Sequence, residues 1–334
     1  MNARRLHQHE RLADCLREAS GAAGHGHVRR RVFLVGCPRS GTTLLQLLLH
    51  AHRQVRSMPE THFLPLLLGS EEHRRSLADR PRSPAARVRR WRRSLLTEFA
   101  MVASWRAAGA WSSLRALGLP VAAPAGTGWL LAAQMAAFVR TLDAHALAIH
   151  KPVWLEKTPD HLFYIDHLRQ GVPDARFIHL QRDGRQVVAS LHRAAKTHSS
   201  WRPFLSLEKC VDRWATAVAE SARWRDDPRH LHVRYEDLAG RPRETLARVL
   251  AFLGCEQDDT LWSRYRAMAA SLILPDEPWK ANNLGPLQAR DGFTEVLDAA
   301  QRRWVDAALA ARAEAVPPAP APFALHARRR PSPG

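Results

Sequence analysis

A short polar loop, GCPRSGTT at residues 36–43, carries the residue types that hold a phosphate or sulfate group. A leucine-rich, helix-like run follows it, so free backbone N–H groups and the helix dipole point at the loop. The spacing nearly matches the nucleotide-binding pattern G-x-x-x-x-G-K-[ST], but Thr42 stands where that pattern has lysine. We therefore expect a terminal phosphate held by amides, by the Arg39 cation and by the hydroxyls of Ser40, Thr42 and Thr43, and no triphosphate–metal site. The alternative is a tight turn without a ligand.

Two further places carry groups suited to the same chemistry. In RDGRQVVAS, Arg182 can form a charge-assisted fork with a phosphate, and Ser190 can add a hydroxyl bond from the helix that we expect to begin near Arg185. Glu60, in the segment MPETHFLP, falls near a strand end, where functional groups converge in open α/β sheets. The alternatives are a surface arginine in a common turn, and a glutamate that only stabilises the following helix.

Short apolar runs alternate with helical patterns along most of the chain. Expected strands cover residues 32–35, 54–57, 153–157, 175–181 and 231–235, and expected helices cover 42–49, 159–169, 186–195 and 242–253. Strands that alternate with helices indicate an α/β fold with a parallel, doubly wound sheet. The fold class that we predict is a P-loop-like parallel sheet flanked by helices, with a mostly helical insertion.

Composition divides the chain into three parts. Residues 1–28 are expected to form a helix and a linker, residues 29–315 the main domain, and residues 316–334 a disordered tail rich in proline and arginine. The helical insertion covers about residues 70–147. It contains an arginine cluster around Trp91, at 87–93, for which a solvated helix face and a groove for an acidic substrate are both open interpretations.

The chain has 334 residues, with 50 Lys+Arg against 32 Asp+Glu and a formal net charge of +18. A field this positive favours anionic ligands, but no nucleic-acid motif accompanies it, so we expect no nucleic-acid partner.

The four cysteines are far apart, which predicts free thiols in a reducing compartment and no metal site; Cys37 is read as a loop filler, with a catalytic thiolate as the alternative. No secretory signal is evident, and the apolar run at 129–139 is too short to cross a bilayer. We expect a cytoplasmic protein, and the arginine- and alanine-rich composition looks bacterial.

Three segments, PRSGTT at 38–43, EKTP at 156–159 and RDGRQVVAS at 182–190, occur together. With them the chain resembles the sulfotransferases that use 3′-phosphoadenosine 5′-phosphosulfate (PAPS), and it looks closest to the tyrosylprotein-sulfotransferase-like branch and its bacterial relatives. The resemblance covers roughly residues 30–69 and 150–255. It implies a 5′-phosphosulfate site made by Arg39, Ser40, Gly41, Thr42 and Thr43. It also implies a 3′-phosphate site made by Arg182 and Ser190.

The resemblance implies four more roles. Glu60 matches the general base that deprotonates the acceptor hydroxyl, and Lys157 matches a lysine that supports charge on the leaving phosphate side. Tyr235, in VRYEDL, matches a tyrosine at the cofactor site, and Lys280 is expected to supply a cation there although the surrounding order departs from the family pattern. Two alternatives stay open: an ion pair of Lys157 with Glu156 or Glu60, and a core aromatic role for Tyr235.

The implied reaction is in-line transfer of a sulfuryl group to an acceptor hydroxyl. A sulfuryl group carries less charge than a phosphoryl group, so no metal is expected, in agreement with the missing lysine of the loop. The acceptor stays open between a small molecule, a glycan and a peptide tyrosine, and so does oligomerisation. Two other functions are alternatives: a P-loop-type ATP- or GTP-dependent kinase, against which Thr42 argues, and a non-catalytic polyanion-binding protein with salt-dependent affinity.

Overall fold

The computed structural model describes residues 27–69, 102–121, 130–269, 272–274, 277, 280 and 291–313. Three expectations lie outside these residues: the N-terminal helix, the arginine cluster at 87–93 and the tail from residue 316. The boundaries of the three expected parts of the chain stay a prediction.

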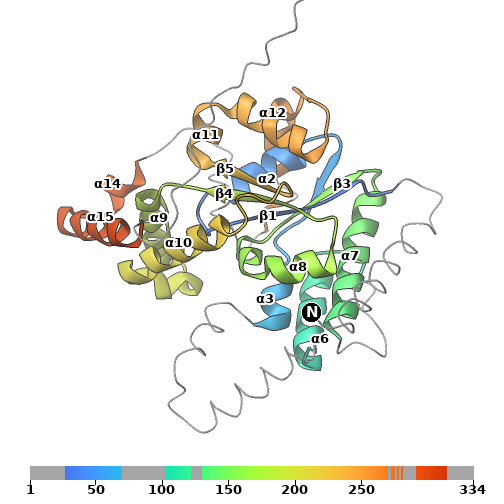
Figure 1. The fold of residues 1–334 in the computed structure, drawn as a ribbon, viewed down its shortest axis with the longest axis horizontal. Coiled ribbons are helices and arrows are strands. Elements are labelled where there is room, and N and C mark those ends of the chain that lie inside the picture. Colours follow the sequence, from blue (N-terminus) through green and yellow to red (C-terminus); the bar gives the residue numbers. More distant parts are fainter. Residues whose placement is uncertain are drawn as a thin grey trace, which may run out of the picture.

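A five-stranded parallel sheet forms the centre of the described structure (Figure 1). Its strands are β1 (Arg30–Gly36), β2 (Val55–Ser57), β3 (Val153–Lys157), β4 (Arg176–Gln181) and β5 (His230–Arg234). The order is β2-β3-β1-β4-β5, and every neighbouring pair is parallel. The predicted fold class is therefore confirmed. Because the strands are parallel, their carboxyl ends meet at one edge, and the polar segments that follow β1, β3 and β4 converge there.

Side-chain alternation along β1 explains why both faces of the sheet are covered by helices. Val32 and Leu34 pack into one buried cluster, whereas Phe33 and Val35 pack into the other. The first face is covered by α2 (Thr42–His50), α12 (Pro242–Leu253) and α13 (Leu261–Ala269). A strand buried on both sides shows a continuous apolar run, which is the pattern that the sequence displays.

Most helices of the second face lie below the sheet in Figure 1, and α9 stands to its left. They are α3 (Phe63–Leu68), α6 (Ser104–Ala116), α7 (Leu131–Leu147), α8 (Ile165–Gly171), α9 (Gly184–Thr197) and α10 (Leu207–Ala222). Both α6 and α7 belong to the stretch expected to be a helical insertion. In the described part of the chain, no helix is long and apolar enough to cross a membrane.

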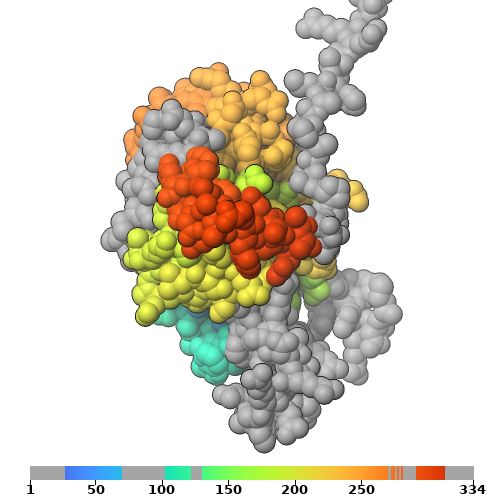
Figure 2. All heavy atoms as spheres, turned by 90° about the vertical axis from the view of Figure 1, so that its left-hand side faces the viewer, coloured from blue at the N-terminus to red at the C-terminus, as the bar shows by residue number. Residues whose placement is uncertain are grey.

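Shorter elements connect and extend these layers. They are η1 (Pro159–Tyr164), η2 (Ser199–Leu205), α11 (Tyr235–Gly240), α14 (Gly292–Val296) and α15 (Ala299–Ala313). Two expected boundaries shift: the helix after β3 begins as the 3₁₀ turn η1, and Tyr235 opens α11 instead of closing β5. Figure 2 shows α14 and α15 lying on the surface over α9 and α10.

Candidate active site

The loop between β1 and α2 has the backbone of an anion cradle. Gly41, the residue before α2, has a φ of 94°, a left-handed conformation that glycine adopts without strain. A Cβ at this position would lie 2.4 Å from Cδ2 of Tyr235, so the backbone and the aromatic ring approach each other too closely for any other residue. No side chain caps the first turn of α2 among the described residues, which leaves its amides to point at the loop.

The loop side chains also suit an anion. Ser40 is fully buried, and its hydroxyl has no hydrogen-bond partner among the described residues. A buried hydroxyl without a partner is costly, so a ligand atom at this point would satisfy it. Arg39 adds the cation, in a left-handed backbone conformation with a φ of 71°. The residues present therefore fit a phosphate or sulfate group.

Arg39, Ser190 and Arg182 form a second, adjoining cluster, because β1 and β4 are neighbours in the sheet. The Nε of Arg39 donates to Oγ of Ser190 at 3.1 Å, and an Arg182 guanidinium nitrogen donates to the Arg39 carbonyl at 3.4 Å. The Arg182 guanidinium stacks 4.2 Å from the centroid of the Tyr235 ring, and Trp214 donates from Nε1 to the Arg182 carbonyl at 3.0 Å. Within the part of the chain that the structure describes, the buried Nε of Arg182 has no hydrogen-bond partner. The positive charges gathered at this point favour a second anionic group.

Burial lowers the pKa of Arg39, and the charges of Arg182 and Arg193 lower it further, while Glu60 opposes them. Burial is the main cause of this shift, and the two neighbouring guanidinium groups add to it because like charges disfavour the protonated form. An anion bound among these arginines would relieve that repulsion.

Glu60 lies in a cage of cations beside the loop. Its Oε1 contacts Nζ of Lys157 and lies 3.0 Å from Nζ of Lys280, and its Oε2 lies 3.5 Å from Nε2 of His62. Lys157 is fully buried and also donates to the Thr43 hydroxyl at 3.3 Å. Lys157 therefore joins the carboxylate directly to the anion cradle.

The cage keeps Glu60 ionised. Burial by itself raises the pKa of Glu60, but Lys157 and then Lys280 lower it well below the usual range. Burial lowers the pKa of Lys157, and Glu60 opposes that fall. The pKa of Lys280 is raised: burial lowers it, and Glu60 and Glu277 outweigh burial. A carboxylate held by two lysines is a weak base until one of the cations turns to another anion.

The structure brings all the sequence-predicted site residues to this one edge of the sheet. Of the two partners considered for Lys157, Glu60 is the one it contacts. Cys37 is buried, and burial raises the pKa of its thiol to about 12, which argues against a catalytic thiolate. Tyr235 is half-buried against Arg182 and Gly41, at the surface of the site.

Sequence reasoning missed three contributors. Glu277 pairs with Lys280 at 2.5 Å, His62 approaches Glu60, and Trp214 holds the Arg182 carbonyl. The three-residue spacing between Glu277 and Lys280 was a usable signal for an ion pair. Nothing in the sequence indicates that Trp214, on α10, reaches the turn after β4.

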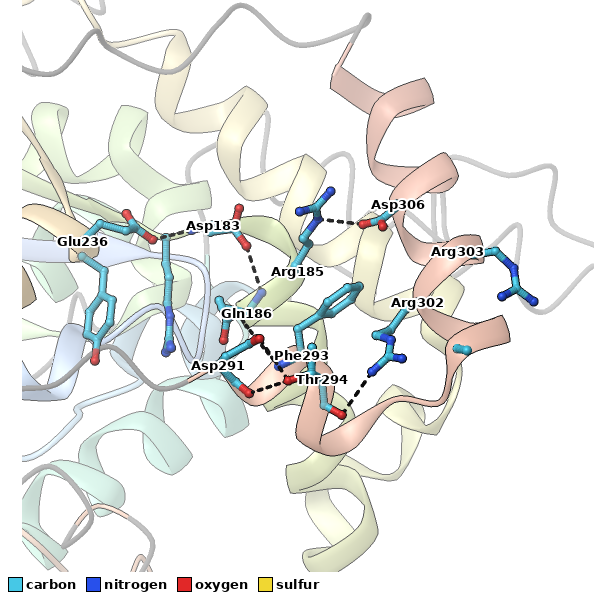
Figure 3. Close-up of a pocket in the computed structure, with 13 residues that line it drawn as sticks. Asp183, Arg185, Gln186, Glu236, Asp291, Phe293, Thr294, Arg302, Arg303 and Asp306 are labelled. Atoms are coloured by element: carbon cyan, nitrogen blue, oxygen red, sulfur yellow. Dashed lines mark hydrogen bonds and ion pairs between the residues drawn. The ribbon is translucent and has the colours of Figure 1, made fainter.

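A cavity of about 740 Å³ opens beside Arg182 and Tyr235 (Figure 3). Its walls come from the turn that begins α9 and from α14 and α15. Gln186 donates from Nε2 to Asp291 at 2.9 Å, and this bond ties α14 to α9. Across the cavity, Arg185 pairs with Asp306 of α15 at 2.7 Å. The volume is in the range of ligand-binding pockets, and the cavity adjoins the Arg39–Ser190–Arg182 cluster.

The fold and the loop define a P-loop-like α/β protein with a loop at the end of β1 that suits an anion. Residues 31–259 match the family model described as "Sulfotransferase family", and the chain belongs to that family. It is 23% identical over 239 residues to protein-tyrosine sulfotransferase A of Caenorhabditis elegans, which covers 71% of this chain and 53% of the relative. It is 25% identical over 238 residues to protein-tyrosine sulfotransferase 2 of Gallus gallus, covering 69% and 52%. The chain thus spans about half the length of these relatives.

Among solved structures, the sulfotransferase domain from the Synechococcus PCC 7002 olefin synthase has a TM-score of 0.52 and 21% sequence identity. The match covers 87% of this chain and 97% of that domain. At this identity the likeness shows a shared fold, in agreement with the parallel sheet and its flanking helices.

Proposed function

We propose that this protein transfers a sulfuryl group from PAPS to an acceptor hydroxyl. The observation that carries the proposal is the junction of an anion cradle with a caged carboxylate: Lys157 contacts both Glu60 and the hydroxyl of Thr43. Membership of the sulfotransferase family and similarity to two protein-tyrosine sulfotransferases support the same reaction.

The donor would be held at two anionic points. The α2 amides, the Arg39 guanidinium and the unpartnered Ser40 hydroxyl suit the 5′-phosphosulfate, with Thr42 and Thr43 beside them. For the 3′-phosphate, the matching groups are Arg182 and Ser190, which already lie together around Arg39. We assign Tyr235 to the nucleoside side, since its ring packs against both Gly41 and Arg182.

In the proposed reaction, Glu60 accepts the proton of the acceptor hydroxyl as its oxygen bonds to sulfur. The bond between sulfur and the 5′-phosphate oxygen breaks at the same time, and Lys157, Arg39 and the loop amides stabilise the charge that grows on that phosphate. When Lys157 turns to the phosphate, Glu60 loses its nearest cation and its pKa rises. Donor binding would thus make the carboxylate a better base. Lys280 stays beside Glu60 and keeps the rise moderate.

The acceptor belongs to the same proposal. A peptide tyrosine is favoured by the names of the curated relatives, and a glycan or small phenol offers the same nucleophilic oxygen. The cytoplasmic location and the bacterial origin stay predictions from composition.

The first experiment is a calorimetric titration with 3′-phosphoadenosine 5′-phosphate in the absence of metal. We expect binding that weakens about 10- to 100-fold in Arg182→Ala, because charge-assisted hydrogen bonds to the phosphate are lost. Arg176→Ala is the matched control, since Arg176 lies at the opposite end of the same strand and donates to the Phe252 carbonyl at 2.8 Å. Absence of binding together with binding of ATP–Mg²⁺ would contradict the proposal and favour the kinase.

The second experiment measures transfer of radiolabelled sulfate from PAPS to tyrosine peptides with acidic flanks, to glycans and to phenols. We expect Glu60→Ala to lower the rate with the productive acceptor by about 10²- to 10⁴-fold while nucleotide affinity is kept. If salt-sensitive binding to polyanions survives both Glu60→Ala and Arg182→Ala and no acceptor is modified, the non-catalytic alternative holds.

A further inference from the structure

Glu156 is a fully buried carboxylate next to Lys157 at the end of β3. Successive residues of a strand face opposite sides, so Glu156 points away from the cation cage. It accepts four hydrogen bonds: from the Thr61 amide at 3.3 Å, the Thr61 hydroxyl at 2.8 Å, the Thr158 hydroxyl at 2.6 Å and Nδ1 of His161 at 2.8 Å. We call Glu156, Thr61, Thr158 and His161 the Glu156 cluster; none of these four residues is exposed.

The cluster extends to the backbone that follows Glu60. The His62 amide donates to the Thr158 hydroxyl at 3.1 Å, and the Leu64 amide donates to Nε2 of His161 at 3.3 Å. Since Nε2 accepts a hydrogen bond, we assign the ring proton to Nδ1, which donates a hydrogen bond to Glu156. Each polar atom of the imidazole thus has a defined partner, and the ring has one orientation.

The cluster touches the immediate neighbours of both groups proposed to do the chemistry. Thr61 follows Glu60 and Thr158 follows Lys157 along the chain. His62, the residue after Thr61, has a left-handed backbone with a φ of 47°. This conformation is unusual for a residue with a Cβ and persists only where surrounding contacts impose it. The hydrogen bond from its amide to Thr158 is such a contact.

The carboxylate suits a purely accepting role. Burial raises the pKa of Glu156, but its neighbour His161 and the hydroxyls of Thr158 and Thr61 lower it below the usual value overall. An ionised carboxylate has only acceptor sites, and all four contacts on this one come from donors.

We propose that Glu156 is a positioning residue, whose ionised carboxylate fixes Thr61 and Thr158 and thereby sets the placement of Glu60 relative to Lys157. This inference rests on the proposed function for its kinetic consequences, but its structural core, the Glu156 cluster, can be tested separately. Glu156 itself touches no reacting atom.

Glu156→Gln keeps the shape and removes the charge. Its amide oxygen can still accept from the threonine side, but its NH₂ group faces the Nδ1 proton of His161, and reversing the amide only exchanges one conflict for another. We expect kcat to fall about 10- to 100-fold, because small misplacements of catalytic groups have effects of this size. The acceptor KM and the affinity for 3′-phosphoadenosine 5′-phosphate should stay unchanged.

Asp143→Asn is the matched control. Asp143 is another largely buried carboxylate that accepts from a β3 residue, Trp154, at 2.7 Å, and from Arg31 at 2.7 and 3.1 Å, but it lies away from the site. It should reproduce a general loss of stability without the fall in kcat. In a Glu60→Ala background, Glu156→Gln should lower the rate no further, since it acts through Glu60. Equal falls in kcat in both variants, or additive effects in the double variant, would overturn the inference.

Amide hydrogen exchange tests the cluster whatever the activity. The amides of Thr61, His62 and Leu64 all donate into it, and Glu156→Gln should speed their exchange at least about tenfold more than Asp143→Asn does. Unchanged exchange would overturn the positioning role even in an active enzyme. Faster exchange in Glu156→Gln, found together with a native protein that binds no nucleotide, would refute the proposed function. The positioning role of the Glu156 cluster would still stand.

Discussion

Replacing Lys280 with methionine should raise the pKa of Glu60. The Lys280 ammonium lies 3.0 Å from a Glu60 oxygen, and the two side chains are only 6% and 14% exposed. At this distance and an effective dielectric constant of about 20, the attraction is about 5.5 kcal/mol. Since one pKa unit corresponds to about 1.4 kcal/mol, the rise has an upper limit of about four units. Lys157 remains in contact, so we expect a rise of between about one and four units.

The sign of the accompanying stability change follows from the direction of the shift. In the native protein the folded-state pKa of Glu60 lies below its unfolded value, so the ionised carboxylate stabilises the fold above the unfolded pKa, and this contribution is lost as the pH falls through the folded pKa. In Lys280→Met the folded-state pKa lies closer to the unfolded value, so this contribution is smaller and its loss is complete at a higher pH. The acidic limb of the rate profile should move the same way, because Glu60 must be ionised to accept a proton.

The assay is a carbon-13 NMR titration of protein labelled at the glutamate carboxyls, with the Glu60 signal assigned through Glu60→Gln. Lys151→Met serves as the control, because Lys151 donates to the His52 carbonyl at 3.2 Å and lies outside the cage. A change in the Glu60 pKa of less than about half a unit in Lys280→Met would refute the cation-cage account of this carboxylate.

Three further predictions concern the loop, the sheet and a thiol. Gly41→Ala should destabilise the fold by about 1–3 kcal/mol and abolish nucleotide binding, because φ is 94° and the new Cβ would meet the Tyr235 ring; urea unfolding and calorimetry measure the two effects. Burial lowers the pKa of His230 to about 4, so the free energy of unfolding should fall between pH 6.5 and pH 4 as the unfolded chain takes up protons first, and His230→Phe should flatten that fall. Cys37 should resist iodoacetamide at pH 8 in the folded protein, as mass spectrometry of its peptide would show.

Each of these has its own discriminating control. Gly109→Ala, at a helical glycine with open space around it, should leave nucleotide binding intact. If His230→Phe leaves the pH dependence of the free energy of unfolding unchanged, other groups are responsible for the acid sensitivity. Rapid alkylation of Cys37 in native buffer, at the rate seen in urea, would contradict the burial of the loop.

The sequence indicated the sheet well because its signals are local. The run Val32–Val35 is apolar at every position, and the structure shows why: alternate side chains enter different clusters on the two faces of β1. The turn between β1 and α2 was equally readable, since Gly41 and the following helix encode its backbone geometry within a few residues.

The cation cage could be predicted only in part. Lys280 was expected to supply a cation at the cofactor site, and this stays a prediction; its ion pairs with Glu60 and Glu277 were not foreseen. The direction of a side chain depends on strand register and on long-range packing, and neither is written in local periodicity. For the same reason Glu156 was considered only as a partner of Lys157. Strand alternation separates the two, and the donors around Glu156 combine the distant Thr61 with residues of the turn that follows β3.

The strand order divides the chain at β1. The strands β2 and β3, between which Glu60 lies in the chain, are on one flank of the central strand, while Arg182, Ser190 and Tyr235 come from the chain after β4 on the other flank. Under the proposed function, changes in the length or sequence of the segment between β2 and β3 can alter acceptor preference during evolution. The residues that bind the nucleotide can change independently of that segment. A chimera that receives only this segment from a relative should take on that relative's acceptor preference and keep its own affinity for the donor.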